Sequence, residues 1–396
     1  MRTGFTPEQE AFRAECAAWL NEQLSGPFAS IRGVTSFSGM VAERRAWERA
    51  LGEAGWGAIG WPKEYGGRGA NLAEQVIFAE EYARAGAPGR MNHVGIELAG
   101  PTLLHFGTEQ QKQRFLKPML LGEEFWAQGY SEPNAGSDLA NIRTRAWLED
   151  GPNGKEWVIE GQKIWTSLAQ YADWIFVLAR TEEGSQGPQG ISFLLVPLKQ
   201  KGVTLRPIRQ ITGDAEFNET FFDGARTAAE NVVGKPGEGW RVAMGLLSHE
   251  RGASSLAMQM NFRNELDRVI EVANANGAAN DPLIRQRIAD AHVGLTLMRY
   301  NALRTLSRRD GDTSLAREGF IHKIYWGTWH RKLGELAMDV LGTPGLVAAQ
   351  PGYDPDDMAR LWLQSRSDTI HGGTNQIQRN IIAERGLGLP REPRGR

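Results

Sequence analysis

The first part of the chain carries apolar residues at the spacing of a helix face. Phe12, Cys16, Trp19 and Leu20 follow the segment TPEQ at positions 6–9. That segment predicts a capping box with proline at the first helical position. Three later stretches with the same period predict further helices before residue 125: ERRAWERALGEAG, NLAEQVIFAEEYARAGA and EQQKQRFLKPMLLG.

The pattern changes near Phe125, where short apolar runs alternate with turn residues. Runs such as WIFVLA and ISFLLV are too short for helices. The stretch TEEGSQGPQG has the composition of a surface turn. The predicted strands are EWVIEGQKIW, DWIFVLAR, GISFLLVPL, GVTLRPI and NETFFD. Strands of this length and spacing predict a small sandwich or barrel.

The helical period returns near Gly239 and persists to the end of the chain. Gly342 and Gly386 are predicted C-caps or breaks. The predicted helices are WRVAMGLLSHERGASSLAMQM, LIRQRIADAHVGLTLMRYNALRTLS, AREGFIHKIYWGTWHRKLGELAMDVLG and QIQRNIIAERGLG. The chain is therefore predicted to be α+β, with an N-terminal α-helical domain over 1–124, a middle β-barrel or sandwich domain over 125–237 and a C-terminal helical bundle over 238–396.

Composition narrows the class of protein. The 396 residues are 41% hydrophobic and carry a net charge of −2, so no basic field favours nucleic acid or an anionic membrane. An apolar run of about 18 residues, which a membrane span needs, is missing, and MRTGFTPEQEAF lacks the apolar core of a signal peptide. We therefore expect a cytoplasmic protein. Cys16 is the only cysteine, which excludes an intrachain disulfide and a Cys-rich metal site.

Two patterns imitate known motifs without their context. A formal G-x-G-x-x-G occupies 55–60, but a charged helix precedes it and Trp-Pro follows at 61–62. A dinucleotide site needs a strand before it, so we interpret these glycines as a helix-to-loop turn. His249 and Glu250 begin an H-E-x-x-H pattern, but Ala253 stands where the second histidine is needed. No metal site is expected.

The segment QGYSEPNAGSD, residues 128–138, joins the helical part to the β part. Ser131, Ser137 and nearby backbone N–H groups can bind a polar ring edge or a phosphate. The Pro-Asn-Ala-Gly elbow lets the backbone approach a ligand closely. A polar hairpin without a ligand explains this stretch equally well when it is taken alone.

Four stretches together resemble the acyl-CoA dehydrogenase family, in that family's order and spacing: LGEAGWGAIGWPKEYGG, QGYSEPNAGSD, GQKIWTSLAQYADWIFVLAR and GTNQIQRNIIAER. The resemblance covers nearly the whole chain. It implies the acyl-CoA dehydrogenase fold, in which a C-terminal four-helix bundle follows the β-barrel and FAD lies between them. It also implies a β-oxidation step of lipid catabolism, in which a base takes the α proton of a thioester and the β hydrogen passes to the flavin as hydride.

The resemblance assigns roles to residues of three segments. The first segment supplies one side of the flavin and the CoA phosphates through Gln128, Tyr130, Ser131 and Ser137. The second covers another part of the isoalloxazine through Trp165, Thr166 and Ser167, although Trp165 is alternatively a barrel-core residue. The third contributes Thr374 and Gln376, where a helix beginning near Asn375 offers unpaired N–H donors.

The catalytic base is the largest departure from the usual pattern. Many family members place a glutamate before the Gly-Thr of the late elbow, and here that position is Gly372. Other members use a Glu-Arg pair in the first helix of the C-terminal bundle, which Glu250 and Arg251 resemble. Glu250 is therefore the predicted base, and a raised pKa is expected if it is buried beside apolar substrate.

Neighbouring residues would complete the substrate site. Arg251 points about 100° away from Glu250 on a helix, so it can contact CoA, cofactor or helix neighbours. Gly372 and Gly373 would leave room for substrate, with Ser137 near the CoA phosphates. A salt-bridged helix residue is the alternative interpretation of Glu250. His371 and His249 are weaker candidates for the base.

Two further departures bear on assembly. An arginine that often contacts a neighbouring subunit's flavin is replaced by Ser314, with Arg317 nearby, and a glutamine with a similar role is replaced by Asp339. Such changes are expected in mixed assemblies. The predicted bundle helices suggest a homo- or heterotetramer, and a dimer fits equally well. An electron-transferring flavoprotein would accept the electrons. The sequences SHER and YADWIFVLAR resemble bacterial members that degrade sterol side chains, which suggests a bulky acyl group.

Two other functions fit the same residues. The missing acid at 372 is compatible with a partner subunit that has little activity alone. A flavin oxidase or monooxygenase on the same fold would differ by reacting rapidly with oxygen.

Overall fold

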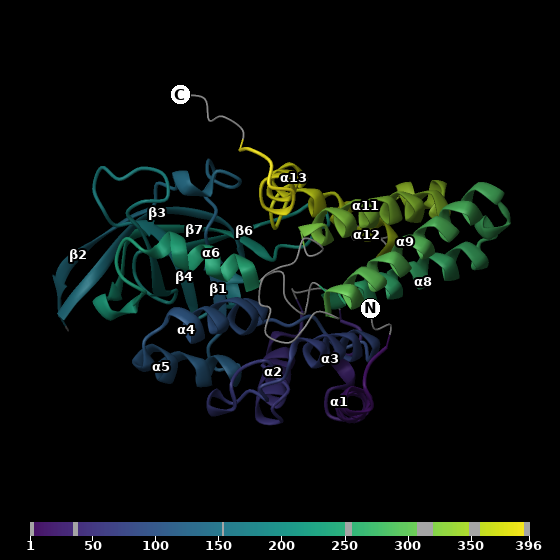
Figure 1. The fold of residues 1–396 in the computed structure, drawn as a ribbon, viewed down its shortest axis with the longest axis horizontal. Helices are drawn as coiled ribbons and strands as arrows, with labels where there is room; N and C mark the ends of the chain where they lie inside the picture. Colours follow the sequence, from purple (N-terminus) through teal and green to yellow (C-terminus); the bar gives the residue numbers. More distant parts are fainter. Residues whose placement is uncertain are drawn as a thin grey trace.

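The computed structural model describes residues 4–34, 39–152, 154–249, 256–306, 320–347 and 357–391. Figure 1 shows N-terminal helices along one side, a sheet above them, and C-terminal helices extending away from the sheet. The chain therefore forms a helical part, a sheet and a second helical part in sequence order, which confirms the predicted α+β class.

The N-terminal helices begin with the predicted capping box. The Thr6 side chain accepts from the backbone N–H of Gln9, and the Gln9 side chain accepts from the N–H of Thr6. Gly55, at φ +73°, follows the end of the second helix, which confirms the helix-to-loop turn. The helices are α1 (Pro7–Ser25), α2 (Val41–Glu53), α3 (Leu72–Arg84), α4 (Gly100–Phe106) and α5 (Glu109–Leu120), with a π-helical turn over Val94–Ala99.

The described strands form one eight-stranded sheet in the order β6-β7-β3-β2-β4-β5-β8, with β1 paired to β4. The β1–β4 pair is parallel, and β4 and β5 are almost fully buried. The five predicted strands are present, whereas β1, β2 and β8 were not predicted. The strands are β1 (Trp126–Gly129), β2 (Arg145–Gly151), β3 (Gly154–Ser167), β4 (Trp174–Arg180), β5 (Ile191–Pro197), β6 (Val203–Ile208), β7 (Phe217–Ala228) and β8 (Val232–Val233).

The C-terminal helices follow the predicted stretches. Gly342 caps α11 with φ +64°, and Gly386 ends a π-helical turn over Ile382–Gly386, so both glycines stand at helix ends as expected. The predicted helix over residues 240–260 contains α6 and the start of α8, and its middle lies outside the described residues. The helices are α6 (Gly239–His249), α8 (Gln259–Ala275), α9 (Pro282–Leu306), α11 (His322–Leu341), α12 (Asp357–Ser365) and α13 (Asn375–Ile381).

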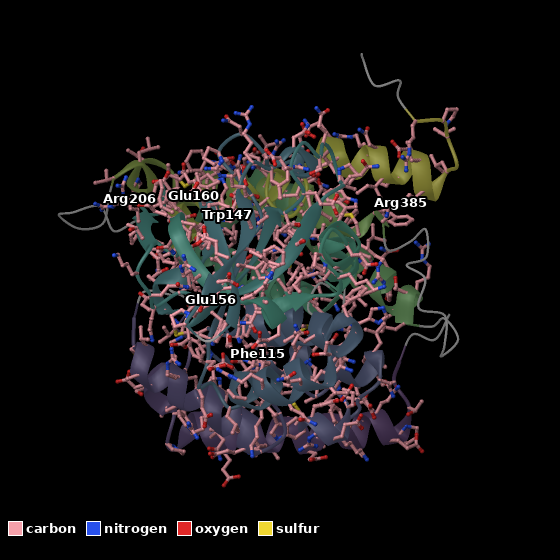
Figure 2. The ribbon with its side chains drawn as sticks, turned by 90° about the vertical axis from the view of Figure 1, so that its left-hand side faces the viewer. Phe115, Trp147, Glu156, Glu160, Arg206 and Arg385 are labelled. Atoms are coloured by element: carbon pink, nitrogen blue, oxygen red, sulfur yellow. The ribbon has the colours of Figure 1, made fainter. Side chains whose placement is uncertain are left out.

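The buried hydrophobic clusters do not follow the three predicted domains. Helices α8, α9, α11 and α12 share one buried cluster. Helix α6 instead packs with the N-terminal helices and the sheet, where Val242, Ala243 and Leu246 are fully buried. Phe115 marks the same core at the boundary between the N-terminal helices and the sheet (Figure 2). The proposed domain boundaries thus stay predictions, because α6 shares its core with residues of two earlier parts.

Two absences hold for the described part of the chain. No helix there is long and apolar enough to cross a bilayer. No group of three metal-ligating side chains gathers there, and Cys16 is a buried free thiol.

Candidate active site

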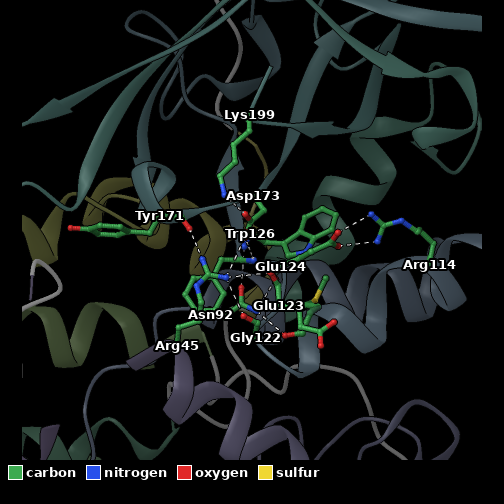
Figure 3. Close-up of polar contacts among 12 residues, drawn as sticks. Arg45, Asn92, Arg114, Gly122, Glu123, Glu124, Trp126, Tyr171, Asp173 and Lys199 are labelled. Atoms are coloured by element: carbon green, nitrogen blue, oxygen red, sulfur yellow. Dashed lines mark hydrogen bonds and ion pairs between the residues drawn. The ribbon is translucent and has the colours of Figure 1, made fainter. Parts of the chain in front are cut away.

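The entry to β1 is fixed where α5 meets the sheet (Figure 3). The fully buried amide of Asn92 donates to the carbonyl of Met119 at 2.9 Å and accepts from the N–H of Trp126 at 3.0 Å. Asn92 thus links the end of α5 to the first residue of β1. An unpaired buried amide would cost free energy, so these bonds hold the register of β1.

Asp173 holds the same junction from the sheet side (Figure 3). Its Oδ2 accepts from the N–H of Phe125 at 2.9 Å, and its Oδ1 accepts from Lys199 Nζ at 2.6 Å. Arg45 donates to the carbonyl of Tyr171 at 3.1 Å and stacks over the Phe125 ring at 3.8 Å. The segment that follows, Gln128–Ser131, therefore leaves β1 in a fixed direction.

Beyond Ser131, a tight hairpin surrounds a buried carboxylate. Glu132 and Ala135 exchange backbone hydrogen bonds around Pro-Asn, as a polar hairpin should. The carboxylate of Glu132 accepts from Lys163 Nζ at 2.8 Å and from the backbone N–H groups of Arg143 and Thr144 at 2.6 and 2.9 Å. One side chain thus ties the hairpin, the strand β3 and the start of β2 together.

The Glu132–Lys163 pair is ionised at neutral pH, although burial lowers the pKa of Lys163 to about 8. Burial acts to raise the pKa of Glu132, but the charge and hydrogen bond of Lys163 and the bonds from residues 143 and 144 lower the pKa overall. Lys163 is fully buried and also donates to the carbonyl of Tyr130 at 3.1 Å. The pair therefore fixes the backbone of Tyr130 as well as the hairpin.

Trp165 is turned out of the sheet beside Ser131. The β3–β7 register shifts between Lys163 and Thr166, and Trp165 sits in this irregularity at φ +61° with 53% of its surface exposed. The preceding residue, Ile164, donates its N–H to the carbonyl of Ser131 at 2.9 Å. An exposed indole therefore lies next to the end of the β1 segment. We call residues 128–131 and 165–167 the sheet wall.

Two residues of the sheet wall have their side chains engaged inside the protein. The Tyr130 ring is 5% exposed and packs edge-on against Phe176 and Phe193. The Thr166 hydroxyl is fully buried and bonds to the Asn218 carbonyl at 2.9 Å. A ligand on this wall would therefore meet the backbone of these residues and the side chains of Gln128, Trp165 and Ser167, which are partly exposed. Their contact with a flavin stays a prediction.

The late elbow, residues 370–378, forms the second part of the candidate site. Gly372 and Gly373 have φ values of +59° and +89°, which L-residues with side chains rarely adopt. The Thr374 hydroxyl caps α13 by accepting from the N–H of Ile377 at 3.1 Å. Gln378 Nε2 donates to the Gly372 carbonyl at 3.3 Å, and Gln376 is exposed. In Figure 1, α13 lies at the end of the C-terminal helices nearest the sheet.

Buried polar atoms near both segments suit a polar ring ligand. Asn375 Oδ1 and Gln378 Oε1 are buried in the elbow region without a hydrogen-bond partner in the described residues. Gln210 Nε2 and Glu216 Oε2 are in the same state, and the Glu216 carbonyl accepts from the N–H directly after Ser167. Buried polar atoms are normally paired, so these atoms and the exposed Trp165 face fit a flavin.

The structure does not test the predicted roles of several other residues. Glu250, Arg251, Ser314 and Arg317 lie outside the described residues. Ser137 is exposed in the turn after the hairpin. Asp339 pairs with Arg287 of α9 on an exposed face. His371 is about half exposed and bonds to Asp368 at 3.2 Å.

Sequence reasoning missed the buried residues whose hydrogen bonds fix the backbone of the candidate site. These are Asn92, Glu132, Lys163, Asp368 and His330, all of which are at least nine-tenths buried. One signal was present, because Lys163 stands at an inward position of a strand and a buried lysine requires a partner. The identity of that partner, 31 residues earlier in the chain, has no local signal.

Three family models match the chain in sequence order. "Acyl-CoA dehydrogenase, N-terminal domain" matches residues 6–123, "Acyl-CoA dehydrogenase, middle domain" matches 127–225, and "Acyl-CoA dehydrogenase, C-terminal domain" matches 237–387. Acyl-CoA dehydrogenase IpdE1 of Mycolicibacterium smegmatis is 52% identical over 397 residues, which cover 98% of this chain and 100% of that protein.

Solved structures with the same fold include two whose names contain two components. The structure named Tcur3481-Tcur3483 steroid ACAD has a TM-score of 0.85 and 31% identity, and covers 99% of this chain and 100% of its own. The ChsE4-ChsE5 complex from Mycobacterium tuberculosis has a TM-score of 0.81 and 30% identity, with coverage of 99% and 100%.

Proposed function

Because the chain belongs to the acyl-CoA dehydrogenase family of oxidoreductases, we propose that it uses FAD to oxidise an acyl-CoA thioester to a trans-2-enoyl-CoA. The main support is the sheet wall, where the exposed Trp165 directly follows Ile164, whose N–H donates to the Ser131 carbonyl at the end of the β1 segment. The Trp165 ring packs edge-on against Phe217, but more than half of its surface stays exposed, which suits a flat aromatic ligand.

FAD, when bound, would supply the hydride acceptor. The chain's own residues would position it. Gln128 and Ser131 would contact one edge, Trp165 and Ser167 another, and Thr374 with Gln376 would approach from the elbow. The backbone at Tyr130 is held by Lys163, so the sheet wall is rigid before any ligand arrives.

The proposed base is Glu250. It follows α6 directly in sequence, and α6 is anchored in the core shared by the N-terminal helices and the sheet. Gly372, the usual position of the acid, has no side chain and adopts φ +59°, so a proton acceptor must come from elsewhere. The carboxylate of Glu250 would take the α proton, and Arg251, Ser137, Gly372 and Gly373 would line the rest of the substrate site.

The names of related structures support a bulky substrate and a mixed assembly. One neighbour is named a steroid acyl-CoA dehydrogenase, and both neighbours have two named components. We propose a sterol-derived or otherwise large acyl group, an assembly of four chains of one or two kinds, and an electron-transferring flavoprotein as acceptor.

The test compares Glu250→Gln with Glu271→Gln, an exposed glutamate on α8 paired only with Arg268 in the described residues. We expect Glu250→Gln to keep its flavin spectrum and to lose about 10²–10⁴-fold in turnover, the usual contribution of a general base. Glu271→Gln should retain full activity. Undiminished turnover in Glu250→Gln would refute the base.

A second measurement tests the reaction class. Straight, branched and steroid-derived acyl-CoA thioesters would be added anaerobically to the purified yellow protein, and bleaching of the flavin band would be recorded. Bleaching by the bulky thioesters supports the proposal. A colourless and inert chain that gains activity only with a second chain would make it a partner subunit, and rapid peroxide release in air would make it an oxidase.

A further inference from the structure

A buried aspartate lies in the turn immediately before the elbow. Asp368 is 4% exposed and belongs to the turn Ser367–Thr369. Its Oδ2 accepts from His330 Nδ1 at 2.5 Å, and its Oδ1 lies 3.2 Å from His371 Nε2. Its backbone carbonyl accepts from the ammonium of Lys323. The turn is thus fastened to α11 through both the side chain and the backbone of one residue.

His330 extends this contact to a third element. Its ring is 5% exposed, and its Nε2 lies 2.8 Å from Glu265 Oε2 on α8. The turn can come this close because α11 has a glycine there, where a Cβ on Gly327 would lie 2.9 Å from the Asp368 carbonyl oxygen. One imidazole therefore joins α8, α11 and the turn before the elbow.

The two carboxylates determine the protonation state of His330. A neutral imidazole has one N–H and can donate to only one carboxylate, whereas an imidazolium donates to both. Burial acts to lower the pKa of His330, but the hydrogen bonds from Asp368 and Glu265 raise it overall to about 9. At neutral pH the ring is therefore charged and makes both bonds.

The turn passes directly into the elbow. The N–H groups of Ile370 and His371 both donate to the Ser367 carbonyl, at 2.8 and 3.0 Å. At the other end, Gln378 holds the Gly372 carbonyl and Thr374 caps α13. The two glycines between these anchors have no side chains of their own to fix them, so their orientation depends on the anchors.

We propose that the His330 imidazolium is a positioning residue that orients elbow residues Gly372–Thr374 through its bond to Asp368, and that this orientation loosens when a neutral ring, with one N–H left, must share it between Asp368 and Glu265. The inference rests on the proposed function only in taking the elbow to face the flavin. His330 does not contact the reacting atoms and acts through the turn.

Other titratable groups surround His330 and must be separated from it. They are Glu265 from α8, Asp368 from the turn, His371 from the elbow and Lys323 on α11 itself. Burial lowers the pKa of Lys323 to about 8, but a neutral amine still has N–H groups and can keep its bond to the Asp368 carbonyl. Arg331 and Glu335 on α11 and Arg366, which directly follows α12, form a more exposed set of charges.

The test uses two amides that each retain one bond of the imidazole. The amide nitrogen of His330→Asn stands near the position of Nδ1 and can still donate to Asp368. That of His330→Gln stands near Nε2 and can donate only to Glu265. Both lose the charge, so a general effect of lost charge or packing would affect them alike. Asp267→Asn, in an exposed ion pair with Arg263 on α8, is the control.

Hydrogen–deuterium exchange of amides 370–378 at pH 7 is the first measurement. We expect His330→Gln to speed exchange by about tenfold or more, the effect of losing a charge-assisted hydrogen bond, while Asp267→Asn leaves it unchanged. The exchange rate in His330→Asn should be clearly lower than that in His330→Gln. Equal exchange in both variants, or no increase in either, would overturn the proposal.

A pH titration of the wild-type holoenzyme tests the same claim if His330→Gln fails to fold. FAD affinity should fall between pH 7 and 10 in the wild type and change much less in His330→Asn. The same slope in both proteins would overturn the proposal. A wild type that binds no FAD at any pH would contradict the proposed function, and the exchange contrast between the two amides would still decide the role of His330.

Discussion

The sheet wall and the elbow are both held by a buried carboxylate, but the donors around the two carboxylates differ. Glu132 is bonded by two backbone N–H groups, which do not titrate, and by Lys163, which keeps N–H groups when it is neutral although burial lowers its pKa to about 8. Asp368 is bonded by two histidines and by a lysine at its carbonyl. The hydrogen bonds to Glu132 therefore persist when Lys163 loses its proton, whereas the two bonds of His330 to carboxylates require a charged ring.

This difference suggests a division of labour. The sheet wall offers a flat aromatic face at the end of a fixed strand, which suits tight binding of a cofactor. The elbow is built from two glycines between anchors, which suits adjustment to a substrate. A site that combines a rigid scaffold with one adaptable segment gains precision without excluding large ligands.

The largest effect is expected from Lys163→Met. This change leaves the Glu132 carboxylate buried without its cation, and breaking a buried pair from one side typically costs about 3–5 kcal/mol. Urea denaturation followed by tryptophan fluorescence would measure the loss. Adding Glu132→Gln to Lys163→Met should recover part of the stability, because the uncompensated charge is gone. A loss below about 1 kcal/mol for Lys163→Met would show that the pair does not hold the sheet wall.

The second largest effect is expected at alkaline pH, where the stability that His330 contributes to the elbow is lost. The pKa of His330 is raised from 6.5 to about 9 in the folded protein, so its stabilisation is complete below pH 6.5 and is lost as pH rises through about 9. The loss is on the order of 3 kcal/mol at most. Between pH 7 and 9.5, denaturation should show that the stability of the wild type falls relative to that of His330→Asn. Lys163 and Lys323, whose pKa values are both lowered to about 8 by burial, are present in both proteins, so their titration cancels in the difference.

The stability that the sheet wall gains from Glu132 should instead be lost at acid pH. The pKa of Glu132 is lowered from 4.5, so its contribution is present above pH 4.5 and is lost as pH falls through the folded-state pKa. Asp368 also has a lowered pKa, so acid weakens both parts while base weakens the elbow. If the free energy of unfolding changed equally at alkaline pH in the wild type and in His330→Asn, the elbow and the sheet wall would not differ in their response to base.

A smaller effect is expected at the cap of α13. Thr374→Ala removes the hydroxyl that accepts from Ile377, which typically costs about 1 kcal/mol of helix stability. Thr374→Ser keeps the acceptor and should be close to wild type. Amide exchange within α13 is the measurement, and equal exchange in both variants would show that the cap contributes little to the elbow.

The smallest effect is expected at the surface end of the β1 junction. Lys199 is 76% exposed and pairs with Asp173 at 2.6 Å. Exposed ion pairs contribute little, so Lys199→Met should change stability by about 0.5 kcal/mol or less. Urea denaturation beside Lys163→Met compares two lysine–carboxylate pairs that differ chiefly in burial. Similar losses of stability in Lys199→Met and Lys163→Met would contradict the expectation that the buried pair contributes more.

Most of the fold could be predicted because its elements carry their own periodic signals. The long helices and the apolar strands β4 and β5 were recognised from pattern alone. Strand β2 was missed because Ala146 is its only fully buried residue, and the strand exists because it pairs with β3 along its whole length. Such a strand is specified by its neighbour rather than by its own sequence.

The candidate site was predictable where its residues are contiguous. The stretches at 128–138, 165–167 and 372–376 were found as motifs, and two of them are brought together by the bond between Ile164 and Ser131. The supporting pairs were not predictable, because nothing in a single sequence connects His330 with Glu265, 65 positions away. Side-chain direction was also hidden, as the buried hydroxyl of Thr166 demonstrates.

Helix α6 belongs in space to the parts of the chain that precede it. Val242, Ala243 and Leu246 fill the core beneath the sheet, while α8, α9, α11 and α12 share a core of their own. A gene split in two should therefore be divided after α6 rather than before it. The first fragment would then keep its interior covered, and the second could be exchanged for that of a relative to make a chimera.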